Sequence, residues 1–115
     1  MDKNEARIQQ EIYLWFNNTY CLVHHVPRLS IFAVPNGGTR DVAEAMSLKA
    51  TGLRAGVSDL IVLLPGKCLF IEVKTESGKQ SPKQIEFEQT VAALGFTYVV
   101  VRSLNDFKEC VKFYL

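Results

Sequence analysis

The 115-residue sequence lacks long apolar runs, paired-cysteine motifs and any large net charge. No stretch approaches the roughly 20 apolar residues that span a bilayer, and the polar first residues are unlike a signal peptide. The three cysteines are far apart and include no Cys-x-x-Cys pair, so we expect reduced thiols in a cytoplasmic protein. A net charge of +1 gives no global basic bias. These absences argue against a membrane span, a disulfide framework and a strongly basic protein.

Repeats, linkers and low-complexity segments are also missing. The length suits a single domain that covers residues 1–115. The adjacent His24 and His25 have no third ligand at metal spacing, which favours a structural or surface role for both.

Hydrophobic spacing predicts alternating helices and short strands. Helices are expected at 3–18, 40–50, 82–94 and after residue 103, strands at 31–34, 59–64, 67–74 and 96–101, and 21–26 stays undecided. The helical crossover between the last two strands favours their parallel pairing. We therefore predict an α/β domain with a mixed β-sheet flanked by helices.

Local signals mark the starts of two helices. Thr39 is expected to cap the helix at 40–50, with Met46 among its inward side chains. Ser81, followed by proline and then by Gln84 three positions after the serine, has the pattern of a capping box.

Two acidic residues, Asp59 and Glu72, stand at the ends of two predicted apolar strands. If the intervening turn centres on Pro65-Gly66, Asp59 faces Glu72, with Cβ atoms about 4.5–5.5 Å apart. Two like charges at that distance repel, and a divalent cation between them, Mg²⁺ or Mn²⁺, would convert the repulsion into ligation. A three-residue loop would instead place the two acids on opposite faces of the sheet.

Two further charged residues are candidates for the same cluster. Lys74 lies two positions after Glu72 and shares its face, where an ammonium would orient an attacking water or stabilise charge on a phosphate. Glu11 lies between Ile8 and Trp15 at helical spacing, so its side chain is expected near the apolar stripe.

Each of these residues also has a simpler interpretation. Asp59 suits a turn that leads into a strand, and Glu72 with Lys74 suits a solvated strand face or an ion pair. Gln84 is accounted for by the capping box, and Glu11 by the edge of a helix.

In combination, the motifs resemble the VRR-NUC family of the PD-(D/E)XK nuclease superfamily. The matching segments are Pro35-Asn36-Gly37-Gly38-x-Arg40, Ala45-x-x-Leu48-Lys49-x-x-Gly52, Gly56-Val57-Ser58-Asp59, Phe70-Ile71-Glu72-Val73-Lys74 and Gly78-x-x-Ser81-x-x-Gln84. One departure is Ser58, where the family usually has proline. The resemblance implies metal ligation by Glu11, Asp59, Glu72 and the Val73 carbonyl, and catalytic roles for Asp59, Glu72, Lys74 and Gln84.

The resemblance also implies an activity. We expect a Mg²⁺- or Mn²⁺-dependent DNA endonuclease, similar to the compact stand-alone members of phages and bacteria. Those members resemble Holliday-junction resolvases, which act on four-way DNA junctions as homodimers. Two alternatives stay open: a nuclease that prefers flaps, nicks or duplex sites, and a non-catalytic DNA-binding module on the same fold.

A local basic excess accompanies these motifs. Residues 28–83 include eight basic and five acidic side chains. We expect phosphate contacts from Arg40, Lys49, Arg54, Lys79 and Lys83, and a close backbone approach at Asn36 and Gly37. The alternative is a set of scattered, solvated charges.

Overall fold

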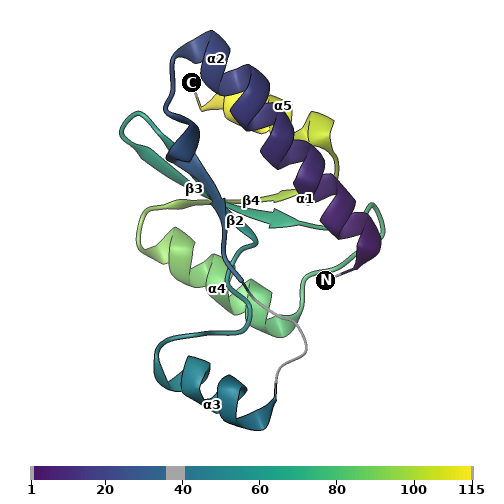
Figure 1. Ribbon diagram of the computed structural model, residues 1–115, viewed down its shortest axis with the longest axis vertical. Helices are drawn as coiled ribbons and strands as arrows, with labels where there is room; N and C mark the ends of the chain where they lie inside the picture. The colour runs from purple at the N-terminus through teal and green to yellow at the C-terminus, as the bar shows by residue number, and fades with distance from the viewer. Residues whose placement is uncertain (1, 36–40, 115) are drawn as a thin grey trace.

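The computed structural model describes residues 2–35 and 41–114, in which helices cover both faces of a four-stranded sheet (Figure 1). In chain order the elements are α1 (Lys3–Trp15), the π-helix η1 (Phe16–Tyr20), α2 (Cys21–His24), the 3-10 helix η2 (Arg28–Ser30), β1 (Ile31–Ala33), α3 (Val42–Ala50), β2 (Leu60–Leu64), β3 (Lys67–Val73), α4 (Pro82–Ala93), β4 (Thr97–Val101) and α5 (Leu104–Phe113). The predicted α/β class with a mixed sheet is confirmed. None of the helices in the described ranges has the length and apolarity that a membrane crossing requires.

The sheet has the strand order β1-β2-β3-β4, antiparallel except for the parallel pair β3-β4. The hairpin register pairs Leu64 with Lys67 and Leu60 with Ile71, so the predicted two-residue turn is confirmed. Gly66 has a φ of 70°, the left-handed conformation that the second central residue of a type II turn requires. The hairpin therefore keeps its register without one of the primed turns that are usual in such short loops.

One face of the sheet forms the main core. Leu60 and Ile71 are fully buried there against Ile12 and Phe16 of the N-terminal helices and Phe107 of α5. The rings of Phe16 and Phe107 meet edge to face, with centroids 6.0 Å apart. Burying an Ile, Leu or Phe side chain contributes about 1.5–3 kcal/mol, so this layer supplies most of the cohesion of the domain.

The opposite face carries an aromatic layer under α4. Phe70 on β3 lies 5.8 Å from Phe87 on α4, and Phe87 lies 6.0 Å from Tyr98 on β4, measured between ring centroids. Side chains two positions apart on a strand share a face, so Glu72 lies on the same face as Phe70. The aromatic layer thus borders the predicted acidic pair.

The N-terminal helical region is longer than predicted. Helix α1 continues through the π-helix into α2, and His25, with a φ of 56°, ends the run in a left-handed conformation. The helix was expected to stop near Asn18, and residues 21–26 were undecided because a short apolar run suits a helix or a strand equally. Packing against the sheet stabilises the helical conformation, since Phe16, Tyr20 and Cys21 are all buried in the core.

Helix α3 differs from its prediction in its cap and its inward face. Asp41 caps the helix, its Oδ1 accepting a hydrogen bond of 2.7 Å from the Glu44 amide, and Thr39 lies outside the described residues. Met46 is 65% exposed, whereas Ala45 and Leu48 are half-buried, so the prediction of an inward Met46 is wrong. Figure 1 shows the reason: α3 lies beyond α4, away from the sheet, and none of its residues is buried.

Candidate active site

The hairpin brings Asp59 and Glu72 to the open end of β2 and β3. Leu60 pairs with Ile71, and one step outward the same register sets Asp59 opposite Glu72. Two contacts fix Asp59: its Oδ2 accepts a 2.7 Å hydrogen bond from the Val73 amide, and its backbone oxygen accepts one of 2.9 Å from the Val34 amide. The facing pair that the turn predicted is therefore present in the structure.

Glu72 is a carboxyl group enclosed by protein. Its side chain has 0% exposure, and neither of its oxygens has a hydrogen-bond partner among the described residues. The pKa of Glu72 is raised from the ordinary 4.5 to about 9, and burial is the largest cause. The hydrogen bond shared with Asp59 when one of the two is protonated, and the charges of Asp59 and Glu5, contribute to the same rise. The Lys74 ammonium opposes these effects and lowers the pKa. A buried acid without a donor is costly, so Glu72 is an unsatisfied polar group of the candidate site.

The acid that helix α1 adds to this pair is Glu5. Asp2 caps the helix by accepting hydrogen bonds from the Asn4 and Glu5 amides, at 2.7 and 3.3 Å, which places Glu5 in the first turn. Glu5 is half-buried and its charge acts on Glu72. Sequence reasoning missed it, although Glu5, Ile8 and Ile12 have the i, i+3, i+7 spacing of one helix face.

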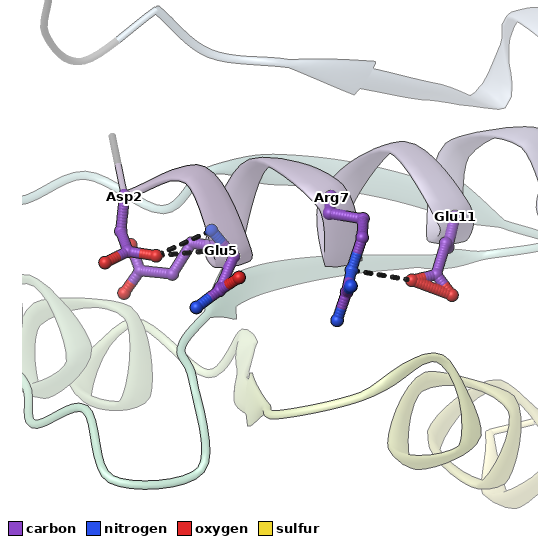
Figure 2. A network of polar contacts seen from close by, with 5 residues as sticks. Asp2, Glu5, Arg7 and Glu11 are labelled. Carbon is purple, nitrogen blue, oxygen red and sulfur yellow. Dashed lines mark hydrogen bonds and ion pairs between the residues drawn. The ribbon is translucent and has the colours of Figure 1, made fainter.

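Glu11, the residue chosen from the sequence, lies elsewhere on α1. It forms an exposed ion pair with Arg7, 3.8 Å between Oε1 and Nε, and its side chain is 48% exposed (Figure 2). Its position, about 100° around the helix from the buried Ile12, places it off the inward stripe. The structure thus does not bring Glu11 to the acidic pair.

Lys74 follows the pair directly and is 9% exposed. Its amide donates a 3.0 Å hydrogen bond to the Val101 oxygen, which extends the β3–β4 pairing by one residue. The loop beyond it is held by Arg102, whose Nη1 donates to the backbone oxygens of Thr75 at 2.7 Å, Glu76 at 3.3 Å and Gly78 at 2.7 Å. A cationic side chain with fixed backbone thus acts on the Glu72 carboxyl.

The loop that carries Asp59 rests on the first turn of α4. Gly56 has a φ of 89°, and a Cβ added there would lie 2.5 Å from the backbone oxygen of Lys83. Ser58, in the position where proline was expected, is 1% exposed and its Oγ donates a 3.3 Å hydrogen bond to the Leu60 oxygen. This contact ties the loop to β2 in place of a rigid proline.

Gln84 closes the capping box at the start of α4. Its Oε1 accepts a 2.8 Å hydrogen bond from the Ser81 amide, and the Ser81 Oγ accepts one of 3.2 Å from the Gln84 amide. The observed contacts of Gln84 are those of the predicted capping box, and its catalytic role stays a prediction.

Four of the predicted phosphate contacts lie among the described residues, Lys49 on α3, Arg54 and Lys79 in loops, and Lys83 on α4. Lys49, Arg54, Lys79 and Lys83 are all exposed. Arg54 and Lys83 line one hollow of about 380 Å³ between the 54–57 segment and α4. Asn36, Gly37 and Arg40 lie outside the described residues.

The donor set fits a hard divalent cation. Carboxylate oxygens are the ligands that Mg²⁺ and Mn²⁺ prefer, and Glu72, whose two oxygens have no partner among the described residues, interacts with Asp59. No group of three His, Cys, Asp or Glu side chains within the described ranges is arranged to hold a metal. A cation would therefore rest on two carboxylates, with the Val73 carbonyl predicted as a further ligand and water completing the shell, as is usual for Mg²⁺.

An aspartate facing an acid-apolar-lysine strand on a mixed α/β sheet defines the class of this site as a PD-(D/E)XK-type nuclease core. The model of the VRR-NUC domain matches residues 3–105, and the chain belongs to this family of nuclease domains. A nuclease domain of this kind implies DNA as the bound polymer.

Two solved structures are similar to this chain. One, described as a VRR_NUC domain protein, has a TM-score of 0.75 and 20% identity over 100% of this chain and 90% of that chain. Another, described as a VRR_NUC domain, has a TM-score of 0.65 and 23% identity over 99% of this chain and 100% of that chain. These similarities establish the shared fold. No curated protein matches the chain in sequence.

Proposed function

We propose that this nuclease domain is a Mg²⁺- or Mn²⁺-dependent DNA endonuclease that selects branched DNA, as a Holliday-junction resolvase does. The observation that carries the proposal is the enclosed carboxyl of Glu72, without a donor among the described residues and facing Asp59. Such a pair is unfavourable in isolation and becomes favourable around a divalent cation.

Each residue of the site has a separate role in the proposed phosphodiester hydrolysis. Asp59 and Glu72 would hold the cation, which when bound polarises the phosphate and lowers the pKa of a water molecule. The Val73 amide donates to Oδ2 of Asp59 and so fixes the carboxylate, whose Oδ1 would ligate the cation. The Lys74 ammonium supports the attacking water or the negative charge that develops on the phosphate. Glu5 adds negative charge from α1 and strengthens the attraction for a cation.

Branched DNA is favoured by the placement of charge and apolar surface. The exposed Lys49, Arg54, Lys79 and Lys83 lie on four different segments, and we propose that they neutralise phosphates of more than one arm. Val23, Leu29 and Leu63 are 65%, 90% and 44% exposed, and Leu29 and Leu63 line one hollow. We propose that a second copy covers this surface, giving a homodimer with two sites for a two-fold junction. The predicted setting is the cytoplasm of a bacterial cell or a phage-infected host.

A panel of labelled DNAs tests this proposal. The wild type is incubated with four-way junctions, flaps, nicked duplexes and linear duplexes, each in Mg²⁺, in Mn²⁺ and in chelator. Glu72→Ala serves as the inactive control. We expect metal-dependent cleavage of the junction, and loss of cleavage in the variant. Preferred cutting of flaps or duplexes would replace the junction assignment, and absence of cleavage on all substrates would favour a non-catalytic DNA-binding module.

A further inference from the structure

Tyr98 lies beside the acidic pair, although no sequence motif pointed to it. The parallel register pairs Phe70 with Tyr98 and Glu72 with Val100, so Tyr98 and Glu72 are diagonal neighbours on one face of the sheet. The Tyr98 ring is half-buried and meets Phe87 edge to face, with centroids 6.0 Å apart. Strand pairing and aromatic packing therefore both fix the position of its hydroxyl.

A hydrogen-bond chain sets the direction of that hydroxyl. Gln80 Nε2 donates to Glu88 Oε1 at 3.0 Å and to the Tyr98 oxygen at 3.2 Å. An ionised carboxylate only accepts, so Glu88 holds the amide nitrogen of Gln80 toward itself, and the second amide proton goes to Tyr98. Because the Tyr98 oxygen accepts from Gln80, its own proton must point elsewhere, and no described residue accepts it.

The electrostatics agree with this placement. Burial raises the pKa of Tyr98, and the charges of Glu72, Glu88 and Asp59 raise it further, while the hydrogen bond from Gln80 lowers it. The hydroxyl therefore keeps its proton at neutral pH and can donate a hydrogen bond without carrying a charge.

We propose that Tyr98 is a further residue of the nuclease site, whose hydroxyl donates a hydrogen bond to a non-bridging oxygen of the scissile phosphate. This role rests on the proposed function, because it requires a phosphate at the cation that Asp59 and Glu72 would hold. Gln80 and Glu88 are positioning residues that act through Tyr98. The tyrosine supplies a donor without charge, which complements the cationic Lys74 and transfers no proton.

The substitution Tyr98→Phe removes the hydroxyl and keeps the ring. We expect single-turnover cleavage to fall about 10- to 100-fold, the range for a lost hydrogen bond to a charged group. The affinity for uncut DNA in Ca²⁺, the affinity for Mn²⁺ and the thermal unfolding midpoint should stay at wild-type values. Tyr114→Phe is the matched control, since Tyr114 is also half-buried but lies near Lys67, at the turn end of the sheet.

A double-mutant cycle separates positioning from structure. Gln80→Met should slow cleavage when Tyr98 is present and have no further effect in the Tyr98→Phe background. Wild-type cleavage by Tyr98→Phe, or equal losses from Gln80→Met in both backgrounds, would overturn the role of Tyr98 while leaving the proposed nuclease intact. If the wild type itself cuts no DNA with either metal, the proposed function fails and the role of Tyr98 fails with it.

Discussion

Replacing Glu72 by glutamine should stabilise the metal-free protein at neutral and alkaline pH. Glu72 is fully buried, and its pKa is raised from 4.5 to about 9, chiefly by burial. Since the folded-state pKa exceeds the unfolded one, the folded protein holds a proton that the unfolded chain releases between these values. The free energy of unfolding is therefore undiminished below pH 4.5, falls as pH rises above it, and levels off near pH 9.

The size of the effect follows from the same two values. Each pH unit above 4.5 costs the wild type about 1.4 kcal/mol, so the cost near pH 7 is of order 3 kcal/mol. Glutamine keeps nearly the same shape and has no charge to desolvate. Glu72→Gln should thus match the wild type near pH 4.5 and exceed it by about 3 kcal/mol at pH 7.

Urea unfolding in the presence of chelator, at several pH values between 4.5 and 9, measures this difference. Glu109→Gln is the control, because Glu109 is exposed on α5, and its unfolding free energy should stay within about 0.5 kcal/mol of the wild type. A gap between Glu72→Gln and the wild type that does not change with pH would refute the enclosed, protonated state of Glu72.

Three other changes test the surroundings of the site. Gly56→Ala should cost about 2–4 kcal/mol of unfolding free energy, because the added Cβ would meet the backbone of Lys83. Gly66→Ala, with open space around its Cβ, should cost only about 1–2 kcal/mol. Equal costs for the two variants would contradict the close packing at Gly56. Arg102→Lys cannot reach three carbonyls, so amide exchange in the 75–78 loop should accelerate and cleavage should fall about 10-fold; unchanged exchange would disprove the clamp. Glu5→Gln should weaken Mn²⁺ binding about 10-fold in calorimetry while Glu11→Gln leaves it unchanged; the reverse order would restore Glu11 to the site.

The hairpin and the start of α4 follow from local sequence. Two consecutive apolar runs, with the turn at Pro65-Gly66 between them, fix the pairing that sets Asp59 opposite Glu72. Ser81 and Gln84 form the predicted capping box, because each satisfies the other's backbone amide without help from the rest of the fold. These features depend on contacts between residues near in sequence, so a pattern suffices to predict them.

Features that depend on packing escaped prediction. Glu5 and Glu11 lie on the same amphipathic helix. Helical spacing alone did not show which of these two acids would lie near the acidic pair. Met46 was expected inward because helical spacing allows it, but α3 has no sheet beneath it. Tyr98 reaches the site only through the parallel pairing of β3 with β4, which joins segments about 25 residues apart in the chain.

Titration of Mn²⁺ into the chelator-treated wild type and Glu72→Gln, followed by calorimetry at pH 7.5, tests the central claim most directly. Running it in two buffers of different ionisation enthalpy also counts the protons released. The paired carboxyls predict that the wild type binds the cation and releases a proton as Glu72 ionises, and that the variant does not bind. Equal binding by both proteins, or none by the wild type, would contradict a metal site on Asp59 and Glu72.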